Sequence, residues 1–389
     1  MSRILIIFIL ISLALATCGD DDSSSDDDFI DDDTTEVPDD DDTIDDDDDT
    51  VDDDNTTDDD TDDDDTLCPA PQDPPGDYHD YEAAWAVAAF ADDNDLPFSG
   101  LYAYFWIDWF YYQGCSYTGA LAGLYGKGGL DDHRFAGGIG LDHDIAYLDD
   151  EVFDVAVSPY MRFRRDDVDV GLVEIGGDGF SGSFTVELHH AKLWTSQYWS
   201  FYDATITDGE LIVDGVTYQP RGRMTVERWQ DMGGHEPSTD LVQGYWLYAP
   251  LHWHDGEGGQ LSTLTWYWLT KNAEGEWEVV IGGALSEDGF SWNVEALTFD
   301  HNFPENENTD GYLRRFAQSG ELQNWQNFSY TARVVSEYRD QLPDGWEVFT
   351  APLERRAHSF VEGELIYKGR TYTGGGVIEW KSTIANPLF

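Results

Sequence analysis

The sequence predicts an all-β protein that contains two antiparallel barrels in tandem, and two observations support this prediction. Residues 96–389 are dense in Gly, Trp, Tyr and Thr, which favour strands and tight turns. The stretch GELIVDGVTYQPRG at 209–222 returns as GELIYKGRTYTGGG at 363–376, with eight of fourteen positions identical. A repeat at this spacing indicates two units of about 150 residues each.

Hairpin signals divide both units into strands. They are the Asp-Gly pairs at 208–209, 214–215, 255–256 and 288–289. A weaker repeat pairs GLYAYFWIDW at 100–109 with GYWLYAPLHW at 244–253. A unit of this length suits an eight-stranded, lipocalin-like barrel, whose interior is filled by side chains or holds one small ligand. Residues 100–112 are apolar on both faces, so we expect one face to line a barrel and the other to contact the second unit.

The domain boundaries follow from these patterns. We assign residues 77–235 to the first barrel and 236–389 to the second. Within 77–93, Tyr81, Trp85, Ala88 and Ala89 have helical spacing, which predicts one short helix before the first strand.

The N-terminus reads as a targeting segment followed by a tether. Residues 1–18 combine Arg3 with a short apolar run, and Leu15-Ala16-Thr17-Cys18 resembles a bacterial lipobox, which predicts lipidation of Cys18; ordinary signal cleavage is the alternative. Residues 19–76 are Asp-rich and are expected to form a disordered tether. We therefore expect a monomer that is lipid-anchored in the bacterial cell envelope and faces the periplasm or the cell surface.

Charge and cysteine content add two expectations. The segment 20–65 holds 29 of the 80 acidic residues and no basic one, and the rest of the chain is acidic too, so a nucleic-acid partner is not expected. If Cys18 carries lipid, Cys68 and Cys115 remain as an even pair in an oxidising compartment, which favours a disulfide between them.

Aromatic residues are the main candidates for ligand binding. The chain has 15 Trp, 21 Tyr and 20 Phe, enough to line an apolar site. An apolar small molecule such as a lipid, isoprenoid or pigment is the expected ligand. The candidate ligand-binding residues are Trp106, Trp109, Trp229, Trp246, Trp253 and Trp266.

No motif indicates a cofactor or covalent catalysis. His252 and His254 alternate along a predicted strand and so share a face, as a two-histidine metal site requires, but no third ligand is evident. A polar pair at a hairpin end is the favoured interpretation, and neither a metal nor a cofactor is predicted. The chain has no Gly-x-Ser-x-Gly motif and no phosphate-binding loop.

Two segments resemble AttH-like and carotenoid 1,2-hydratase-like (hydroxyneurosporene synthase) proteins. SQYWSFYDATITDGELIVDGVTYQPRGRMTVERWQDMGG at 196–234 resembles the middle of these proteins, and GWEVFTAPLERRAHSFVEGELIYKGRTYTGGGVIEW at 345–380 resembles their last strands. The resemblance implies two lipocalin-like barrels. Known members include hydratases of isolated carbon–carbon double bonds and, more remotely, cyclases.

The resemblance points to Glu227 as a candidate catalytic acid, because hydratase-like members have an Asp about five residues after the counterpart of Gly222. A carboxylic acid in an apolar barrel suits this chemistry, since desolvation keeps it protonated near neutral pH. The alternative is an ion pair with Arg228 at a barrel rim. Trp229 and Asp231 belong to the same segment, and Glu379 is expected to be a structural carboxylate that accepts backbone N–H bonds.

Three functions remain open at this point. The first is a tethered protein that binds an apolar small molecule. The second is a cofactor-independent hydratase, isomerase or cyclase that uses Glu227. The third is a surface glycan binder or glycosidase, because exposed aromatic rings stack on sugars and paired carboxylates cleave them.

Overall fold

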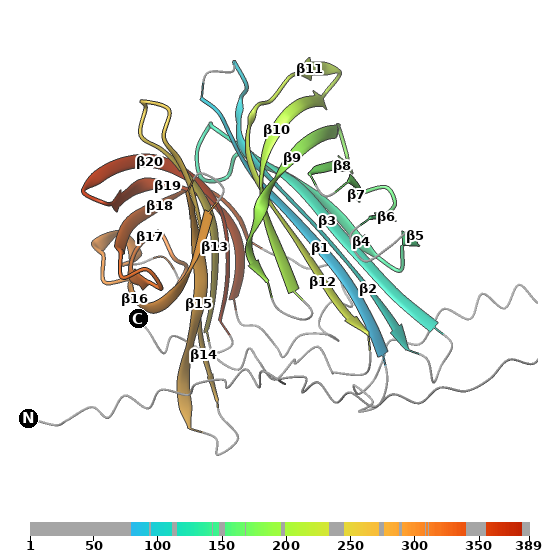
Figure 1. The fold of residues 1–389 in the computed structure, drawn as a ribbon. Coiled ribbons are helices and arrows are strands. Elements are labelled where there is room, and N and C mark those ends of the chain that lie inside the picture. Colours follow the sequence, from blue (N-terminus) through green and yellow to red (C-terminus); the bar gives the residue numbers. More distant parts are fainter. Residues whose placement is uncertain are drawn as a thin grey trace, which may run out of the picture. The chain divides into compact units, whose positions relative to one another are not determined.

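The structure is a computed structural model. It describes residues 79–92, 95–110, 115–141, 143–147, 152–167, 169–195, 199–232, 245–271, 276–287, 290–307, 309, 311–339 and 355–382. Almost all of these residues form antiparallel strands, which fall into two sheets (Figure 1). None of the helices in these ranges is long and apolar enough to span a membrane.

The first sheet has twelve strands and curls around its own core without closing. Along the path β4-β3-β2-β1-β12-β10-β9-β8-β7-β6-β5 each strand pairs with the next, and β11 pairs with β10 at the side. Within the described residues no pairing joins β4 to β5, so the predicted first barrel is an open, curled sheet. Its strands are β1 (His79–Phe90), β2 (Phe98–Phe110), β3 (Cys115–Gly126), β4 (His133–Ile139), β5 (His143–Tyr147), β6 (Phe153–Val157), β7 (Met161–Asp167), β8 (Val170–Gly177), β9 (Phe180–Thr195), β10 (Trp199–Val213), β11 (Val216–Tyr218) and β12 (Gly222–Met232).

The second sheet is a closed eight-stranded barrel, as predicted. Its inward residues form one apolar core that includes Trp253, Phe316, Tyr330 and Trp380. Side chains therefore occupy the barrel interior. The strands are β13 (Tyr245–His254), β14 (Gln260–Lys271), β15 (Trp277–Glu287), β16 (Phe290–Asp300), β17 (Arg315–Leu322), β18 (Asn327–Arg339), β19 (Arg355–Tyr367) and β20 (Arg370–Ser382), and one 3₁₀ turn, η2 (Pro304–Asn306), lies between β16 and β17.

The helix predicted over 77–93 is wrong, because β1 occupies this segment. This strand lies between β2 and β12 and is buried on both faces. Ala84 and Ala86 contact the core of the curled sheet, whereas Ala83 and Val87 belong to a cluster with residues of β19 and β20. A strand with two buried faces needs no polar alternation, so the helical spacing of its larger residues was a coincidence.

The long repeat marks equivalent hairpins, as predicted. The first copy spans the end of β10, the turn at Asp214-Gly215, β11 and the start of β12, and the second links β19 to β20 through Lys368-Gly369. Both turns have positive φ at their two central residues, as type I′ turns do. The weaker repeat does not mark equivalent strands: β13 pairs with the last strand of its unit, whereas in the first unit β1 does so and not β2.

The two faces of β2 have the roles that the sequence predicted. Leu101, Phe105 and Ile107 lie in the core of the curled sheet. Tyr102 and Trp106, on the opposite face, share a cluster with Phe360 of β19. The two units therefore contact each other through the outer faces of their strands.

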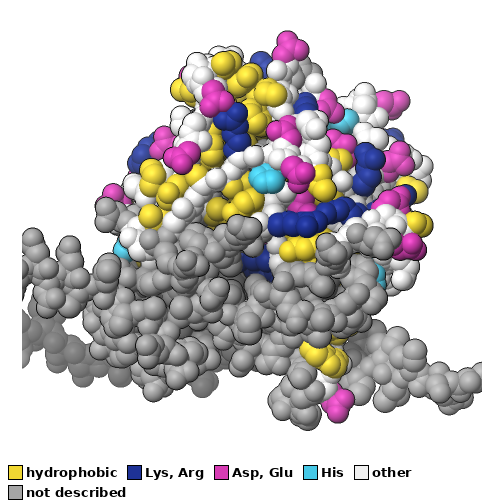
Figure 2. Space-filling view, turned by 180° about the vertical axis from the view of Figure 1, so that it is seen from behind, with side chains coloured by type: hydrophobic (Ala, Val, Ile, Leu, Met, Phe, Trp, Pro, Cys, Tyr) yellow, Lys and Arg dark blue, Asp and Glu magenta, His cyan; other side chains and the backbone are white. Residues whose placement is uncertain are grey.

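Basic and acidic side chains are interspersed on the face shown in Figure 2. The ion pairs of the curled sheet include Arg162 of β7 with Asp154 of the neighbouring β6, and Arg134 of β4 with Asp214 in the turn between β10 and β11. Several sequence predictions fall outside the described residues: the signal segment, the tether, Cys18, Cys68 and the side chain of Cys115.

Candidate functional site

Strand register places two rows of side chains on the outer face of the closed barrel. The strands β14, β13, β20 and β19 lie next to one another in this order, and the inward residues that alternate with these rows, such as Leu247 and Ile378, belong to the barrel core. The first row is Trp268, Trp246, Lys381 and Arg356, and the second is Trp266, Tyr248, Glu379 and His358.

The curled sheet presents a matching surface on its own outer face. Here the strands β2, β1, β12 and β10 are neighbours, and the alternate residues, such as Ala86 and Val226, point into the core of that sheet. One row on this face is Tyr104, Trp85, Glu227 and Phe201, and the next is Tyr102, Val87, Thr225 and Asp203.

These two outer faces contact each other. The Tyr248 hydroxyl donates a hydrogen bond of 2.7 Å to Oε2 of Glu227. The Phe201 ring lies 5.9 Å from the Tyr248 ring and 6.3 Å from the Trp266 ring, and the Tyr102 ring lies 4.3 Å from the His358 ring. We call this layer, formed by β1, β2, β10 and β12 against β13, β14, β19 and β20, the junction.

Glu227 lies inside the junction and is only 2% exposed. Its neighbours across the sheet are Trp85 on one side and Phe201 on the other. The alternative interpretation, an ion pair with Arg228 at a rim, does not fit this geometry, because adjacent residues of a strand point to opposite faces. The Arg228 guanidinium lies 4.0 Å above the ring of Phe153, in the core of the curled sheet.

Glu379 is the second buried carboxylate of the junction, and its partners differ from those expected. Cations bind it, with Arg356 Nη2 at 3.1 Å and Lys381 Nζ at 2.8 Å from Oε1. The predicted backbone N–H bonds to Glu379 are therefore replaced by side-chain ion pairs. Burial alone would raise the pKa of Glu379, but Lys381 and Arg356 outweigh it and lower this pKa to about 2.

Tyr248 remains protonated over the ordinary pH range. Burial raises the pKa of its hydroxyl well above the usual value, and the interaction with Glu227, including the hydrogen bond, adds to the shift. The carboxylate of Glu379 adds to this effect. The junction therefore combines an ionised carboxylate, a neutral phenol and the Glu227 carboxyl group that the phenol contacts.

A hydrogen-bonded network of polar side chains also crosses the junction, beside Glu227. Asp203 binds Arg223 and accepts a hydrogen bond of 2.8 Å from Ser262. Ser262 in turn lies 2.8 Å from Nδ1 of His252, whose Nε2 lies 3.3 Å from the Thr225 hydroxyl. Because Ser262 donates to Asp203, its oxygen accepts from Nδ1–H of His252, and Nε2 is left to accept from Thr225.

The pKa shifts in this network agree with a neutral His252. Burial lowers the pKa of His252 to about 3, although Asp203 opposes the shift. Burial would raise the pKa of Asp203, but the Arg223 guanidinium holds it below the usual range.

His252 and His254 do not converge on a shared metal position. Hydrogen bonds occupy both ring nitrogens of His252, while His254 is exposed. Within the described ranges no three His, Cys, Asp or Glu side chains are grouped in a way that could hold a metal ion.

The six candidate tryptophans occupy different environments. Trp246 and Trp266 lie in the junction, where Trp246 stacks on Trp268 with ring centroids 4.5 Å apart. Trp106 also faces the junction, beside Tyr104 at 5.3 Å. Trp253 points into the closed barrel and donates to Thr263, and the side chains of Trp109 and Trp229 lie outside the described part.

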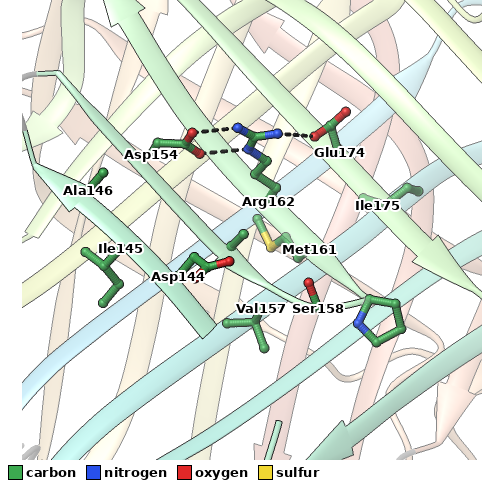
Figure 3. A pocket seen from close by; sticks show the side chains of 12 residues that line it. Asp144, Ile145, Ala146, Asp154, Val157, Ser158, Met161, Arg162, Glu174 and Ile175 are labelled. Carbon is green, nitrogen blue, oxygen red and sulfur yellow. Dashed lines mark hydrogen bonds and ion pairs between the residues drawn. The ribbon is translucent and has the colours of Figure 1, made fainter. Parts of the chain in front are cut away.

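A separate pocket of about 620 Å³ lies along β5 to β8 (Figure 3). Arg162 crosses it between Asp154 and Glu174, at 2.6 and 3.2 Å. Neither Glu227 nor His252 lines this pocket. Its ion pairs make it a poor match to the apolar site that the sequence predicts.

Several residues of the junction were not identified from the sequence: Tyr102, Asp203, Tyr248, Arg356, His358 and Lys381. Tyr248 and His252 lie in the same aromatic strand, an even number of positions apart, and Lys381 follows Glu379 by two positions. These spacings place each pair on one strand face. The pairing of Tyr248 with Glu227 joins strands whose contact no local pattern predicts.

Comparisons with known proteins support the fold. No family model matches the sequence. No curated protein matches it either. Kievitone hydratase from Nectria haematococca has a similar structure, with a TM-score of 0.50 and 10% identity over 78% of this chain and 89% of that one. An AttH-type protein from Nitrosomonas europaea gives 0.50 and 11% over 79% and 93%. The predicted resemblance to AttH-like proteins is thus confirmed at the level of the fold.

Proposed function

We propose that the protein is a cofactor-independent enzyme of the hydratase, isomerase or cyclase type that acts on an apolar substrate at the junction. The observation that carries the proposal is the buried Glu227 carboxyl group, which accepts a hydrogen bond from Tyr248 among aromatic side chains. One solved structure with this fold is of a kievitone hydratase. The predicted N-terminal lipid anchor would place this activity at the cell envelope.

Glu227 supplies the proton in this proposal. Desolvation favours the neutral, proton-bearing form of a carboxyl group, and the proton moves from the Glu227 carboxyl to one carbon of the substrate double bond. Tyr248 holds the carboxyl group in one orientation. Water then adds to the cationic carbon and loses a proton to Glu227, which restores the acid; loss of a neighbouring proton instead gives an isomer.

The aromatic side chains suit a cationic intermediate. Rings that face a desolvated cation stabilise it by about 0.5–2 kcal/mol each. Trp246, Trp266 and Phe201 line the junction next to the Tyr248 and Glu227 pair. Glu379 does not add to this stabilisation, because two cations, Arg356 and Lys381, bind its single negative charge.

Isotope labelling tests the proposal. The full-length protein is incubated in ¹⁸O-labelled water with a panel of prenylated phenols and isoprenoid alkenes, and products are analysed by mass spectrometry. We expect either a product heavier by one labelled water or an isomer of unchanged composition with a new retention time. Glu227→Gln should lower the rate by about 10²–10⁴-fold.

The matched control is Glu210→Gln, which changes an exposed glutamate on β10 in the same way. This variant should keep the wild-type rate. Equal rates in the two variants would exclude Glu227 as the acid.

Binding of an apolar molecule without turnover is the second candidate function. The Trp246, Trp266 and Trp268 rings favour it, because they form an aromatic surface on the barrel face of the junction. A ligand that is extracted unchanged from the purified protein, together with no product in the labelling experiment, would favour this function over catalysis.

A further inference from the structure

Tyr102 is a buried hydrogen-bond donor that the proposed reaction does not use. Its side chain is 1% exposed, and its hydroxyl has no hydrogen-bond partner in the described part of the chain. A buried hydroxyl without a partner costs about 1–3 kcal/mol of stability. Phenylalanine would occupy the same place without this cost, so the hydroxyl calls for a functional explanation.

The position of Tyr102 points to the reaction site. Its ring lies 4.3 Å from the ring of His358, which stands opposite Glu379 on the neighbouring strand. Glu379 does not satisfy the Tyr102 hydroxyl, since this hydroxyl has no hydrogen-bond partner among the described residues, and Oε1 of Glu379 binds Arg356 and Lys381 instead. Burial, followed by the negative charge of Glu379, raises the pKa of Tyr102 well above the usual value, so this hydroxyl keeps its proton.

Trp246 provides a second donor of the same kind. Its indole Nε1 is buried and has no hydrogen-bond partner among the described residues. Nζ of Lys381, which binds Glu379, lies 5.1 Å from the centre of the Trp246 ring system. Trp246 thus adjoins the Lys381–Glu379 ion pair on the closed barrel, and Tyr102 approaches the neighbouring His358 from the curled sheet.

We propose that the Tyr102 hydroxyl and the Trp246 indole are donors to oxygen of the substrate, so that the substrate is an apolar molecule carrying a carbonyl or hydroxyl group and not a pure hydrocarbon. This inference rests on the proposed function, because it places the substrate in the junction. A site built to hydrogen-bond an oxygen rejects the analogue that lacks it, since its own donors would stay unpaired. Glu227 remains the group that acts on the double bond.

Two probes of matched shape test the inference. The ketone 2-acetonaphthone carries an acceptor oxygen, and 2-ethylnaphthalene replaces it with hydrocarbon. Equilibrium dialysis against the full-length protein should show tighter binding of the ketone. Tyr102→Phe should weaken ketone binding about tenfold and leave the hydrocarbon unchanged, because one hydrogen bond is lost. Trp246→Phe should shift the preference in the same direction.

Thermal unfolding separates this role from a structural one. Tyr102→Phe should melt at the wild-type temperature or above, because it removes an unpaired hydroxyl. Tyr330→Phe is the control: its hydroxyl bonds Thr265 and Gln318 inside the closed barrel, so this variant should melt lower and bind both probes normally.

Three outcomes would overturn the inference. Equal affinity of the wild type for both probes would do so while leaving the apolar site intact. A Tyr102→Phe variant that melts lower and keeps the ketone preference would show a structural hydroxyl. Binding of neither probe would refute the apolar site itself, and the inference with it.

Discussion

At the scale of residues, the two buried glutamates of the junction have different partners and therefore different roles. Both follow the repeated hairpin: Glu227 stands five positions after Gly222, and Glu379 three positions after Gly376. Glu379 is held as an anion by two cations, whereas Glu227 accepts from the neutral Tyr248. The hairpin copies agree in sequence, but the strands that follow them diverge where the candidate chemistry lies.

The buried His252 leads to a prediction about how the free energy of unfolding depends on pH. Its pKa in the folded state is about 3, below the ordinary value of 6.5. Between these two values His252 is protonated in the unfolded chain but stays neutral in the folded protein. The stability from neutral His252 is complete above pH 6.5 and is lost as the pH falls towards 3. Over this interval we expect His252 to contribute a slope of up to about 1.4 kcal/mol per pH unit.

Urea unfolding measured through this interval checks the sign and size of the effect. His252→Gln should be less stable than the wild type at neutral pH and should show a shallower loss on acidification. The exposed His254→Gln is the matched control and should follow the wild-type slope. Identical slopes in all three proteins would show that His252 titrates normally in the folded state.

At the scale of elements, the last strand of each unit carries the candidate site. β12 begins at Gly222, where the chain has a φ of 152° and comes so close to β1 that a Cβ atom would lie 2.1 Å from the carbonyl oxygen of Ala89. Glycine therefore fixes the pairing of β12 with β1. That pairing sets which face of β12 presents Glu227 to the junction.

Gly222→Ala tests the importance of this contact. We expect the free energy of unfolding to fall by about 2–4 kcal/mol, because backbone must move and the φ angle is strained. Gly215→Asn is the control, since Gly215 has a φ of 80°, no atom within 4 Å of its Cβ position, and Asn tolerates this conformation. A melting temperature of Gly222→Ala equal to that of the control would contradict the proposed packing.

The sequence predicts elements better than it predicts the site. The repeated hairpin, the closed second barrel and the two-faced β2 follow from local patterns and were confirmed. β1 was missed because a strand buried on both faces lacks the alternation that identifies strands. Glu227 was identified because its segment resembles hydratase-like proteins. Its contact with Tyr248 depends on how the outer faces of two sheets meet, and such a contact leaves no periodic signal in the sequence.

At the scale of the whole molecule, the two units meet through faces that a single barrel would expose to solvent. Their inward faces hold apolar cores, including Trp253 and Phe316 in the closed barrel. Their outer faces hold the buried carboxylates, the tyrosines and the stacked tryptophans. The two units thus form the two walls of one candidate site, and we infer that an apolar molecule is held between the units and not inside either one.

Photolabelling tests most directly whether an apolar molecule binds between the two units. The full-length protein is irradiated with an apolar diazirine probe, and the labelled residues are identified by mass spectrometry. Residues alternate in direction along each strand, so the labelled positions distinguish the junction from the barrel interior. We predict labels on outward residues such as Tyr248, Trp266 and Glu227; labels confined to inward residues such as Leu247, Trp253 and Phe316 would contradict the account.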